Sequence, residues 1–546
     1  MFLFVLAGAF ANPIPAGEML NESLMVDFPP QGFEALEGVI PGLIPSPIEI
    51  PEVMEGTTCN KIVFKNAVAD IEVQNVFLTP QSGYMDMEMD LAIALNDPNA
   101  RFKLNYWLVC VKYNCLGYVD PFPTNVVGSF NIAFVDEDGD GVKEADVQFT
   151  EDLSIDIGLT GDHIHLAECP LNFLEDVFNF FGGSLYELVI NAIDVNSIIS
   201  DALPEIELAI EDALNQANID ETVDLGGTSL RIQMKPNEAI LQPEGLRMVF
   251  DSSSSVEAPA ECVQDYDPLS SKGTNNPSVT LEEFPSTFEF GATVADDFVN
   301  QTLYSLWSGG ALCQTIDEEI FALDTSILNL VTGDAYLEFF PDTVPMVIQT
   351  NPKKAPTLNM DTASDIGVDV EELGLDFYAE IDGRKARVLG MDLNTQVGVD
   401  LNLDAQTGAL DLALDIDTQN VTASVSFNEF LPTDQDAVIE QEFVGQLDTI
   451  LGLVDIEGLL GDLNITLPAI SLGDSSIGLQ SMLIKSTGGA QEDMTIFASM
   501  GPVSYGSGCG AEESEGCGGG CSTTSSGFGR SFLLLLVLAG ALRRRM

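Results

Sequence analysis

The residues best suited to chemistry stand in one acidic stretch, from Asp136 to Asp146. Its carboxylates alternate with glycines that can turn the chain, a spacing that lets several oxygens converge on one Ca²⁺ ion. The stretch departs from the EF-hand pattern at Val147, and strand-like rather than helical sequence flanks it. We predict a calcium site, with a plain acidic hairpin as the alternative. The candidate ligands are Asp136, Asp138, Asp140, the Val142 carbonyl, Glu144 and Asp146.

Acid–base and nucleophilic chemistry have little support in the sequence. His163 and His165 are the only histidines, and their spacing places them on one face of a strand. A zinc site with Cys110 and Cys115 is conceivable, but the spacing is unlike ordinary zinc motifs. There is no nucleophile elbow, HExxH motif, P-loop or dinucleotide fingerprint. We therefore expect a protein that is not an enzyme.

Composition and the chain start indicate an exported protein. The 546 residues carry a net charge of −66, which argues against nucleic acid as a partner. An acidic solvated surface without a specific partner also accounts for that charge. Residues 1–11 form a short apolar run that ends in Ala9-Phe-Ala11, as signal peptides do before cleavage.

The chain end predicts attachment to a membrane. Cys517 and Cys521 precede a Ser/Thr/Gly spacer, an apolar run from Phe532 to Leu542, and three arginines. The run is shorter than the roughly 20 residues of an ordinary spanning helix. The arrangement resembles the MYXO-CTERM class of bacterial sorting signals. That resemblance implies processing near Cys517 or Cys521 by a C-terminal sorting protease and attachment at the cell surface or outer membrane. An uncleaved membrane anchor is the alternative.

Cysteines of an exported chain favour disulfides over metal thiolates. The pairs we favour are Cys110 with Cys115 and Cys262 with Cys313, although the sequence leaves the connectivity open.

Three stretches have the period of amphipathic helices. Apolar residues from Leu185 to Ala217 recur at steps of three, four and seven, with Pro204 as a kink and Glu205 and Glu211 on the polar face. A second helix is predicted from Thr293, as its cap, through Trp307. A third is predicted from Thr433 to Leu453, with Val438 among its inner residues.

Strand patterns surround these helices. Met85, Met87 and Met89 alternate with acidic residues, a period of two with one wet face. A strand pair is predicted around the turn 235–238, another across 405–408, and a last pair over 477–484 and 494–500. Both halves thus read as strands, a long helix and a strand pair. The expected fold is α+β, with two elongated pseudo-symmetric barrels, each a curved antiparallel sheet wrapped around a long amphipathic helix.

The expected domains follow from these patterns. They are a signal peptide (1–11), a Pro-rich leader (12–55), a first barrel (56–255), a linker (256–286), a second barrel (287–502), a Gly/Ser/Cys spacer (503–531) and a hydrophobic segment with an arginine cluster (532–546).

The two-half organisation resembles the BPI/LBP/CETP-like group of the tubular lipid-binding (TULIP) superfamily. The segment Phe288-Glu-Phe-Gly-Ala-Thr-Val-Ala-Asp-Asp-Phe-Val-Asn-Gln-Thr-Leu-Tyr-Ser-Leu-Trp307 is similar to the opening helix of that family's second barrel, and 441–500 to its closing helix and strand pair. The resemblance implies apolar tunnels that hold lipid tails between helix and sheet. Because the chain lacks a cationic tip, phospholipid or another neutral or zwitterionic lipid is expected rather than lipopolysaccharide.

The residues predicted to contact lipid are apolar positions on the sheet and the helices. They are Met85, Met87, Met89, Leu188, Ala192, Ile199, Leu203, Ile206, Val294, Phe298, Phe443, Leu447 and Ile450. On pattern alone such residues also suit a plain protein core. The alternative function is a calcium-stabilised structural or adhesive cell-surface protein with solid barrels.

Overall fold

The computed structural model describes most of residues 14–502. Residues 1–13, 168–202, 271–283 and 503–546 lie outside the description, as do shorter stretches between them. The expected signal peptide, the spacer with Cys517 and Cys521, and the C-terminal apolar run therefore fall outside the described residues. Within the described part of the chain, no helix has both the length and the apolar character needed to cross a membrane.

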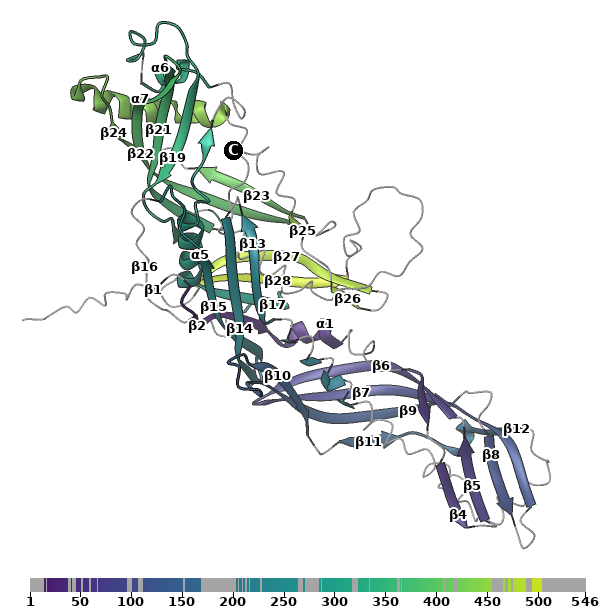
Figure 1. The fold of residues 1–546 in the computed structure, drawn as a ribbon. Helices are drawn as coiled ribbons and strands as arrows, with labels where there is room; N and C mark the ends of the chain where they lie inside the picture. The colour runs from purple at the N-terminus through teal and green to yellow at the C-terminus, as the bar shows by residue number, and fades with distance from the viewer. Residues whose placement is uncertain are drawn as a thin grey trace, which may run out of the picture. The chain divides into compact units, whose positions relative to one another are not determined.

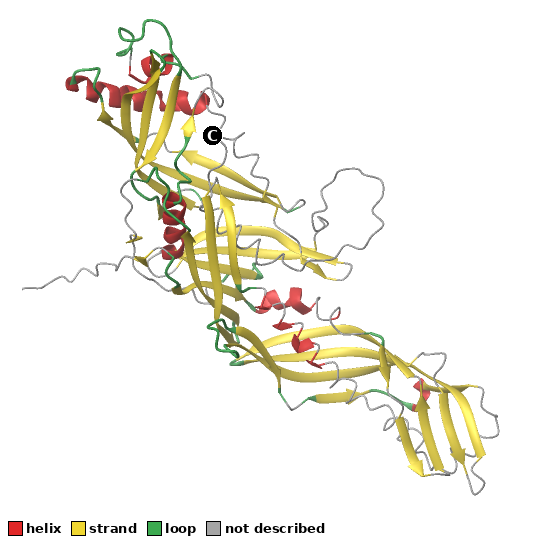
Figure 2. Cartoon of the chain, viewed as in Figure 1, coloured by secondary structure: helices red, strands yellow, loops and turns green. Residues whose placement is uncertain are grey.

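The chain divides into two compact units, in which antiparallel strands predominate and helices are few (Figures 1 and 2). The smaller unit comprises residues 28–215 and 239–247, and the larger unit comprises 1–27, 216–238 and 248–546. Each unit is described by itself.

The smaller unit is built on a curved ten-stranded sheet with the order β3-β6-β7-β9-β8-β5-β4 (Figure 1). Three further strands, β10, β11 and β12, pair one after another along the long strand β9. The strands are β3 (Ile48–Ile50), β4 (Val53–Thr57), β5 (Asn60–Lys65), β6 (Ala67–Gln81), β7 (Tyr84–Leu95), β8 (Arg101–Tyr106), β9 (Val111–Val135), β10 (Glu144–Phe149), β11 (Ser154–Ile157) and β12 (Ile164–Ala167). The short helix α1 (Phe33–Glu37) lies against β6, where the Leu78 N–H donates to Glu37 Oε1.

Two eight-stranded sheets belong mainly to the larger unit. The first has the order β13-β14-β15-β2-β17-β28-β27-β26, with β13 (Ile219–Leu225), β14 (Thr228–Gln242), β15 (Gly245–Val256), β2 (Leu20–Phe28), β17 (Phe290–Ala295), β28 (Asp493–Pro502), β27 (Ser475–Thr487) and β26 (Ile470–Leu472). The second contains β18 (Thr315–Ile316), β19 (Met346–Pro352), β20 (Thr357–Asn359), β21 (Ile366–Ile381), β22 (Arg384–Asp404), β23 (Ala409–Ile416), β24 (Thr422–Phe427) and β25 (Ile465–Thr466). A separate short pair joins β1 (Ile14–Pro15) to β16 (Leu269–Ser270).

In the part of the chain that the structure describes, the helices beside these sheets are α5 (Asp296–Ser308), α6 (Ser326–Thr332) and α7 (Asp436–Leu453). The predicted third helix is confirmed, with a 3₁₀ turn at 433–435 before it. The cap predicted at Thr293 is wrong, because β17 runs to Ala295 and α5 begins after it. A run of buried residues on both faces of β17 leaves no helical period there.

The described residues differ from the two expected barrels in how their strands are shared. β14 and β15 lie in the same sheet as β27 and β28, with β2 and β17 between the two pairs. The Pro-rich stretch 12–55 is therefore not an extended leader throughout, since β2 is an inner strand of that sheet. Alternation in a sequence defines the faces of a strand and not its partners.

Turn positions were predicted with mixed success. The hairpin across 405–408 is confirmed, with Val397 opposite Ile416 and Leu403 opposite Leu410. The turn predicted at 235–238 is wrong, because β14 continues through those residues to Gln242. The chain turns instead at 243–244, before Gly245, whose φ is +143°. A Cβ there would lie 2.3 Å from the Phe28 carbonyl oxygen, so this close approach requires glycine.

Candidate functional site

A row of three methionines forms part of the inner face of the ten-stranded sheet. Met85, Met87 and Met89 are each at most 2% exposed, whereas the acidic residues between them are at least partly exposed, as the alternation predicted. Across the sheet, Met85 lies opposite Phe130 and Met89 opposite Val126, both buried. These residues make a continuous apolar wall across β7 and β9.

Gly128 lies opposite Met87 and leaves a dip in this wall. A Cβ at Gly128 would meet Leu153 Cδ2 at 2.5 Å, so a leucine side chain occupies the dip. Protein atoms thus fill the wall at that point.

Helical residues between 203 and 215 lie along the free edge of β10, and we call the described ones the edge helix. They are Leu203, Pro204, Ile206, Glu207, Leu208, Ile210, Glu211, Leu214 and Asn215. Leu203 and Ile206 are buried, as predicted for the apolar stripe, and Leu208 is 59% exposed. The other predicted stripe residues, Leu188, Ala192 and Ile199, lie outside the described residues.

Three polar side chains of the edge helix accept hydrogen bonds from the backbone of β10. Glu207 Oε1 accepts from the Phe149 N–H at 3.0 Å, and Glu211 Oε1 accepts from the Val147 N–H at 2.9 Å. Asn215 Oδ1 accepts from the Ala145 N–H at 2.7 Å. Four helical residues rise about 6 Å and two strand residues about 6.6 Å, so the two periods stay in step.

These edge contacts were not anticipated from the sequence, which only placed Glu211 on the polar face. A signal was present in the spacing of Glu207, Glu211 and Asn215, because residues at i, i+4 and i+8 share one side of a helix. Only the structure shows that this side lies on a strand edge. The contacts satisfy amides that an edge strand would otherwise present to solvent.

Helix α5 is surrounded by protein along its whole length, and every one of its residues is buried. Asn300 Oδ1 accepts from the Leu358 N–H at 2.7 Å, and Gln301 Oε1 accepts from the Ser254 N–H at 2.8 Å. The predicted lipid residue Phe298 belongs to this helix. Val294 precedes it, on β17 rather than on the predicted helix face, and is also buried.

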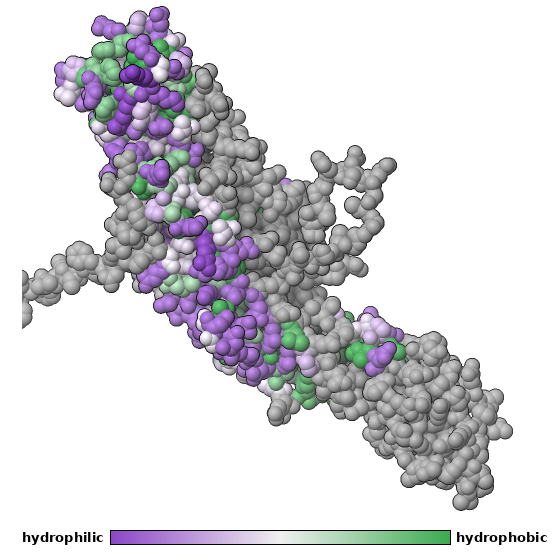
Figure 3. All heavy atoms as spheres, in the orientation of Figure 1, coloured by the Kyte–Doolittle hydropathy of each residue, from purple (hydrophilic) through white to green (hydrophobic). Residues whose placement is uncertain are grey.

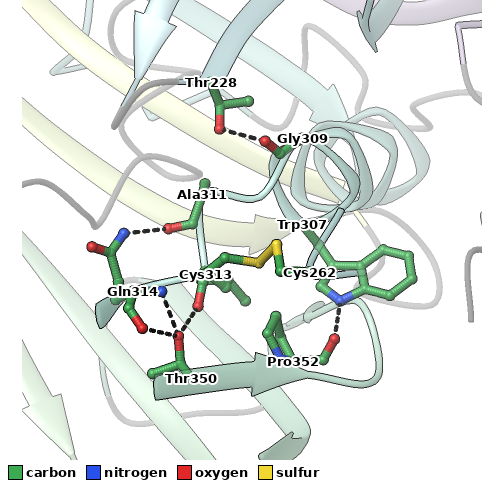
Figure 4. Close-up of a disulfide and its surroundings, with 10 residues drawn as sticks. Thr228, Cys262, Trp307, Gly309, Ala311, Cys313, Gln314, Thr350 and Pro352 are labelled. Atoms are coloured by element: carbon green, nitrogen blue, oxygen red, sulfur yellow. Dashed lines mark hydrogen bonds between the residues drawn. A yellow bond between two sulfur atoms is a disulfide. The ribbon is translucent and has the colours of Figure 1, made fainter. Parts of the chain in front are cut away.

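The predicted disulfide between Cys262 and Cys313 is confirmed, and it lies beside the end of α5 (Figure 4). The indole N–H of Trp307 donates to the Pro352 carbonyl at 2.9 Å in the same region. Cys110 and the side chain of Cys115 lie outside the description.

Helix α7 covers a core made of protein side chains. Phe443 and Leu447 belong to one buried cluster with Tyr336, which follows α6, and with residues of β21 and β22 such as Phe377. Val438, expected to face inward, is 46% exposed, and the neighbouring Ile439 is buried instead. The Ile450 side chain lies outside the description.

Two polar contacts accompany this core. Tyr336 Oη donates to the Val388 carbonyl at 2.8 Å, and burial raises the pKa of this phenol well above its usual range. Glu440 Oε1 accepts from the Val425 N–H of β24 at 2.9 Å. Among the described residues, helix α7 thus makes one contact of the kind that the edge helix makes three times.

The acidic stretch brings three of its six predicted ligands together. Candidate oxygens of Asp136, Asp138 and Asp140 lie within 4.8 Å of one another, and all three residues are exposed. Asp136 accepts from the Gly139 N–H, and Asp140 from the Val142 N–H at 2.7 Å.

The predicted carboxylate ligands Glu144 and Asp146 do not join the group, and the Val142 carbonyl stays a prediction. Glu144 and Asp146 belong to β10, where Asp146 Oδ2 accepts from the Gln148 side chain. The two histidines have separate partners: Thr160 N donates to His163 Nδ1, and His165 Nε2 pairs with Asp120 Oδ2 at 2.7 Å. Among the described residues, the aspartate triad is the one grouping of candidate metal ligands.

A surface depression of the smaller unit lies away from the predicted lipid-contacting residues. A depression of about 610 Å³ on the outer side of the ten-stranded sheet is lined by residues such as Tyr84, Ser129 and Asn131, and by none of the predicted lipid-contacting residues. Over the residues that Figure 3 colours, the visible face is largely hydrophilic, with hydrophobic residues interspersed.

Comparisons with known proteins give distant likenesses. No family model and no curated protein matches the chain. The crystal structure of lipopolysaccharide binding protein has a TM-score of 0.46 at 11% identity, over 88% of this chain and 99% of that protein. P47 of Clostridium botulinum E1 has a TM-score of 0.27 at 9% identity, over 89% of this chain and 100% of that one. Takeout 1 of Epiphyas postvittana has a TM-score of 0.20 at 11% identity, over 34% and 93%. At these scores the function has to be argued from the chain's own residues.

Proposed function

We propose that this chain is an exported, surface-attached lipid-binding protein that holds acyl chains against the inner face of the ten-stranded sheet, and that it performs no chemistry on them. The observation that carries the proposal is the methionine row. Methionine is unbranched and has three rotatable bonds, so a row of methionines makes a wall that adapts to a chain of variable shape. A core of fixed shape is usually built from residues with better-defined rotamers.

The energetics are sufficient for such a ligand. An acyl chain of about 15 methylenes would gain on the order of 12 kcal/mol gross from leaving water. The costs of association and ordering reduce this figure to an ordinary binding free energy. The net charge of −66 disfavours the binding of anionic lipids. The expected ligand is therefore a phospholipid with a zwitterionic head group or a neutral lipid.

Export and surface attachment are supported by the two chain ends. The apolar residues 1–11 support export, and the cysteines, apolar run and arginines of the last 30 or so residues support a sorting signal. Mass spectrometry of the mature protein from its host tests this part. A C-terminus at or near Cys517 or Cys521 is expected, and a soluble, unprocessed chain would contradict attachment.

The substitution Met87→Trp tests the binding site. If lipid lies against the methionine row, the larger side chain takes the place of lipid, so bound phospholipid falls while the melting temperature is maintained. If the interior is solid, overpacking lowers the unfolding free energy by about 1–3 kcal/mol and leaves lipid content unchanged. Glu88→Gln, on the outer face of the same strand, is the matched control and should change neither quantity.

A second candidate role, calcium-dependent stabilisation, is favoured by the convergence of Asp136, Asp138 and Asp140. Extracellular calcium modules bind with Kd values of about 10⁻⁴–10⁻³ M. We expect millimolar Ca²⁺ to raise the melting temperature of the wild type, and Mg²⁺ to do so less, because Mg²⁺ requires stricter geometry. Asp138→Asn should abolish the shift. A wild type that is insensitive to Ca²⁺ would leave the loop as an acidic hairpin.

A further inference from the structure

The edge helix lies at the rim of the apolar interior. Ala145 and Val147, whose amides donate to the edge helix, have buried side chains on the strand that ends the sheet at this point. Among the described residues, β10 pairs with β9 alone, so its other edge is covered by the edge helix and not by a strand.

A row of side chains connects this rim to the methionine row. Phe149 lies opposite Phe130, and Phe130 lies opposite Met85, so the three occupy adjacent strands in register. The rings of Phe149 and Phe130 have centroids 5.2 Å apart. An acyl chain that passed the rim would therefore meet apolar side chains continuously from β10 to β7.

The attachment of the edge helix is of a kind that water can replace. Three of its contacts are hydrogen bonds to backbone amides, and on release both partners would be solvated, so only the small net strength of each bond is lost. Of its described apolar residues, Leu203 and Ile206 are buried, Ile210 and Leu214 are partly buried, and Leu208 is largely exposed.

We propose that the edge helix is the portal of the lipid site: it detaches reversibly from β10 at Phe149, Val147 and Ala145 and admits an acyl chain to the interior beside the methionine row. This inference rests on the proposed lipid-binding function and assigns the place of uptake. Lipid then enters along a strand edge, and its passage requires the release of these three hydrogen bonds.

The experiment measures uptake by the full chain from vesicles of dioleoylphosphatidylcholine that carry a trace of fluorescent, self-quenching phosphatidylcholine. The variant Glu207→Ala/Glu211→Ala should take up lipid about thirtyfold faster, since two ordinary hydrogen bonds together correspond to about that factor. Hydrogen exchange at the amides of Val147 and Phe149 should accelerate as well, while the amount of lipid bound at equilibrium stays the same. Glu440→Ala removes the corresponding acceptor on α7 and should leave the uptake rate at the wild-type value.

Each other outcome decides the matter. Uptake at the wild-type rate despite faster exchange, or equal acceleration by Glu440→Ala, would overturn the portal and leave lipid binding intact. Unchanged amide exchange would show that these contacts do not hold the helix, which also overturns it. A wild type that neither contains nor takes up phospholipid would remove the proposed function itself. If the double variant does not fold, Asn215→Ala, which removes one bond, should accelerate uptake about fivefold.

Discussion

The edge helix of the smaller unit and helix α7 of the larger unit both place a helix against a strand edge, but they are held by different forces. The edge helix gives three side-chain acceptors to β10 through Glu207, Glu211 and Asn215. Helix α7 gives one acceptor to β24, through Glu440, and sets Ile439, Phe443 and Leu447 into a closed core.

The difference bears on which helix can move. Separating α7 from its sheet would expose a large apolar area to water. This costs about 25 cal/mol of free energy per Å² exposed, and no hydrogen bond to water offsets it. Separating the edge helix releases three hydrogen bonds whose amides and side-chain oxygens water solvates well, and it exposes the side chains of Leu203 and Ile206. A protein that must open to admit a ligand is expected to open where its contacts are polar.

Phe443→Ala is expected to have the largest effect on the unfolding free energy, and it tests whether the core beneath α7 is filled. A deleted aromatic side chain in a filled core costs about 3–5 kcal/mol of unfolding free energy, because the cavity collapses only in part. Urea unfolding followed by circular dichroism measures it. Val438→Ala, on the exposed side of the same helix, is the control and should cost less than about 0.5 kcal/mol. A loss below about 1 kcal/mol for Phe443→Ala would mean that the α7 core is not filled.

The parts of the fold visible in the sequence are those with local periodicity. The alternation around Met85, Met87 and Met89 predicted both faces of β7, and the apolar period of 433–453 predicted α7 nearly to its bounds. The helical residues 203–215 were expected for the same reason. Such patterns involve only residues that are close in sequence, so they can be recognised without knowledge of the tertiary fold.

What the sequence did not show depends on pairing between distant residues. The position of β2 between β15 and β17 joins segments more than 200 residues apart, and no local pattern encodes it. The turn at 235–238 was misassigned because Pro and Asn favour turns, whereas here Asn237 Nδ2 donates to Asp251 Oδ1 within the sheet. The contacts of Glu207 and Glu211 require knowledge of the strand edge they lie on.

Tyr336→Phe is expected to have an intermediate effect and adds a pH test of the α7 core. The loss of the hydrogen bond to the Val388 carbonyl should cost about 1 kcal/mol near pH 7. Burial raises the folded-state pKa of this phenol above its ordinary value of 10.0. The associated stability is fully present below pH 10.0 and is lost as the pH rises further, since the unfolded phenol ionises first.

The measurement is the unfolding free energy of both proteins from neutral to alkaline pH at high salt, which screens the net charge. The wild type should lose stability above pH 10.0 more steeply than Tyr336→Phe. Parallel curves for the two proteins would indicate that the phenol is solvated and that the core beneath α7 is open.

Glu440→Ala is expected to have the smallest effect and compares the two helices directly. It should lower the unfolding free energy by about 1 kcal/mol and accelerate exchange at the Val425 amide alone. Glu211→Ala should instead accelerate exchange at Val147 and at the neighbouring amides of Ala145 and Phe149, because Glu211 is the middle one of three acceptors along β10. Equal, localised responses in both variants would show that the two helices are held alike.

Native mass spectrometry of the full chain purified from its host tests the central claim most directly. Acyl lipid against the methionine row predicts a mass above that of the polypeptide by one or more phospholipid or neutral-lipid molecules, which organic extraction removes and Met87→Trp diminishes. A chain with the mass of the polypeptide alone, in the wild type and in Met87→Trp, would contradict lipid binding and leave a solid β-sheet protein in its place.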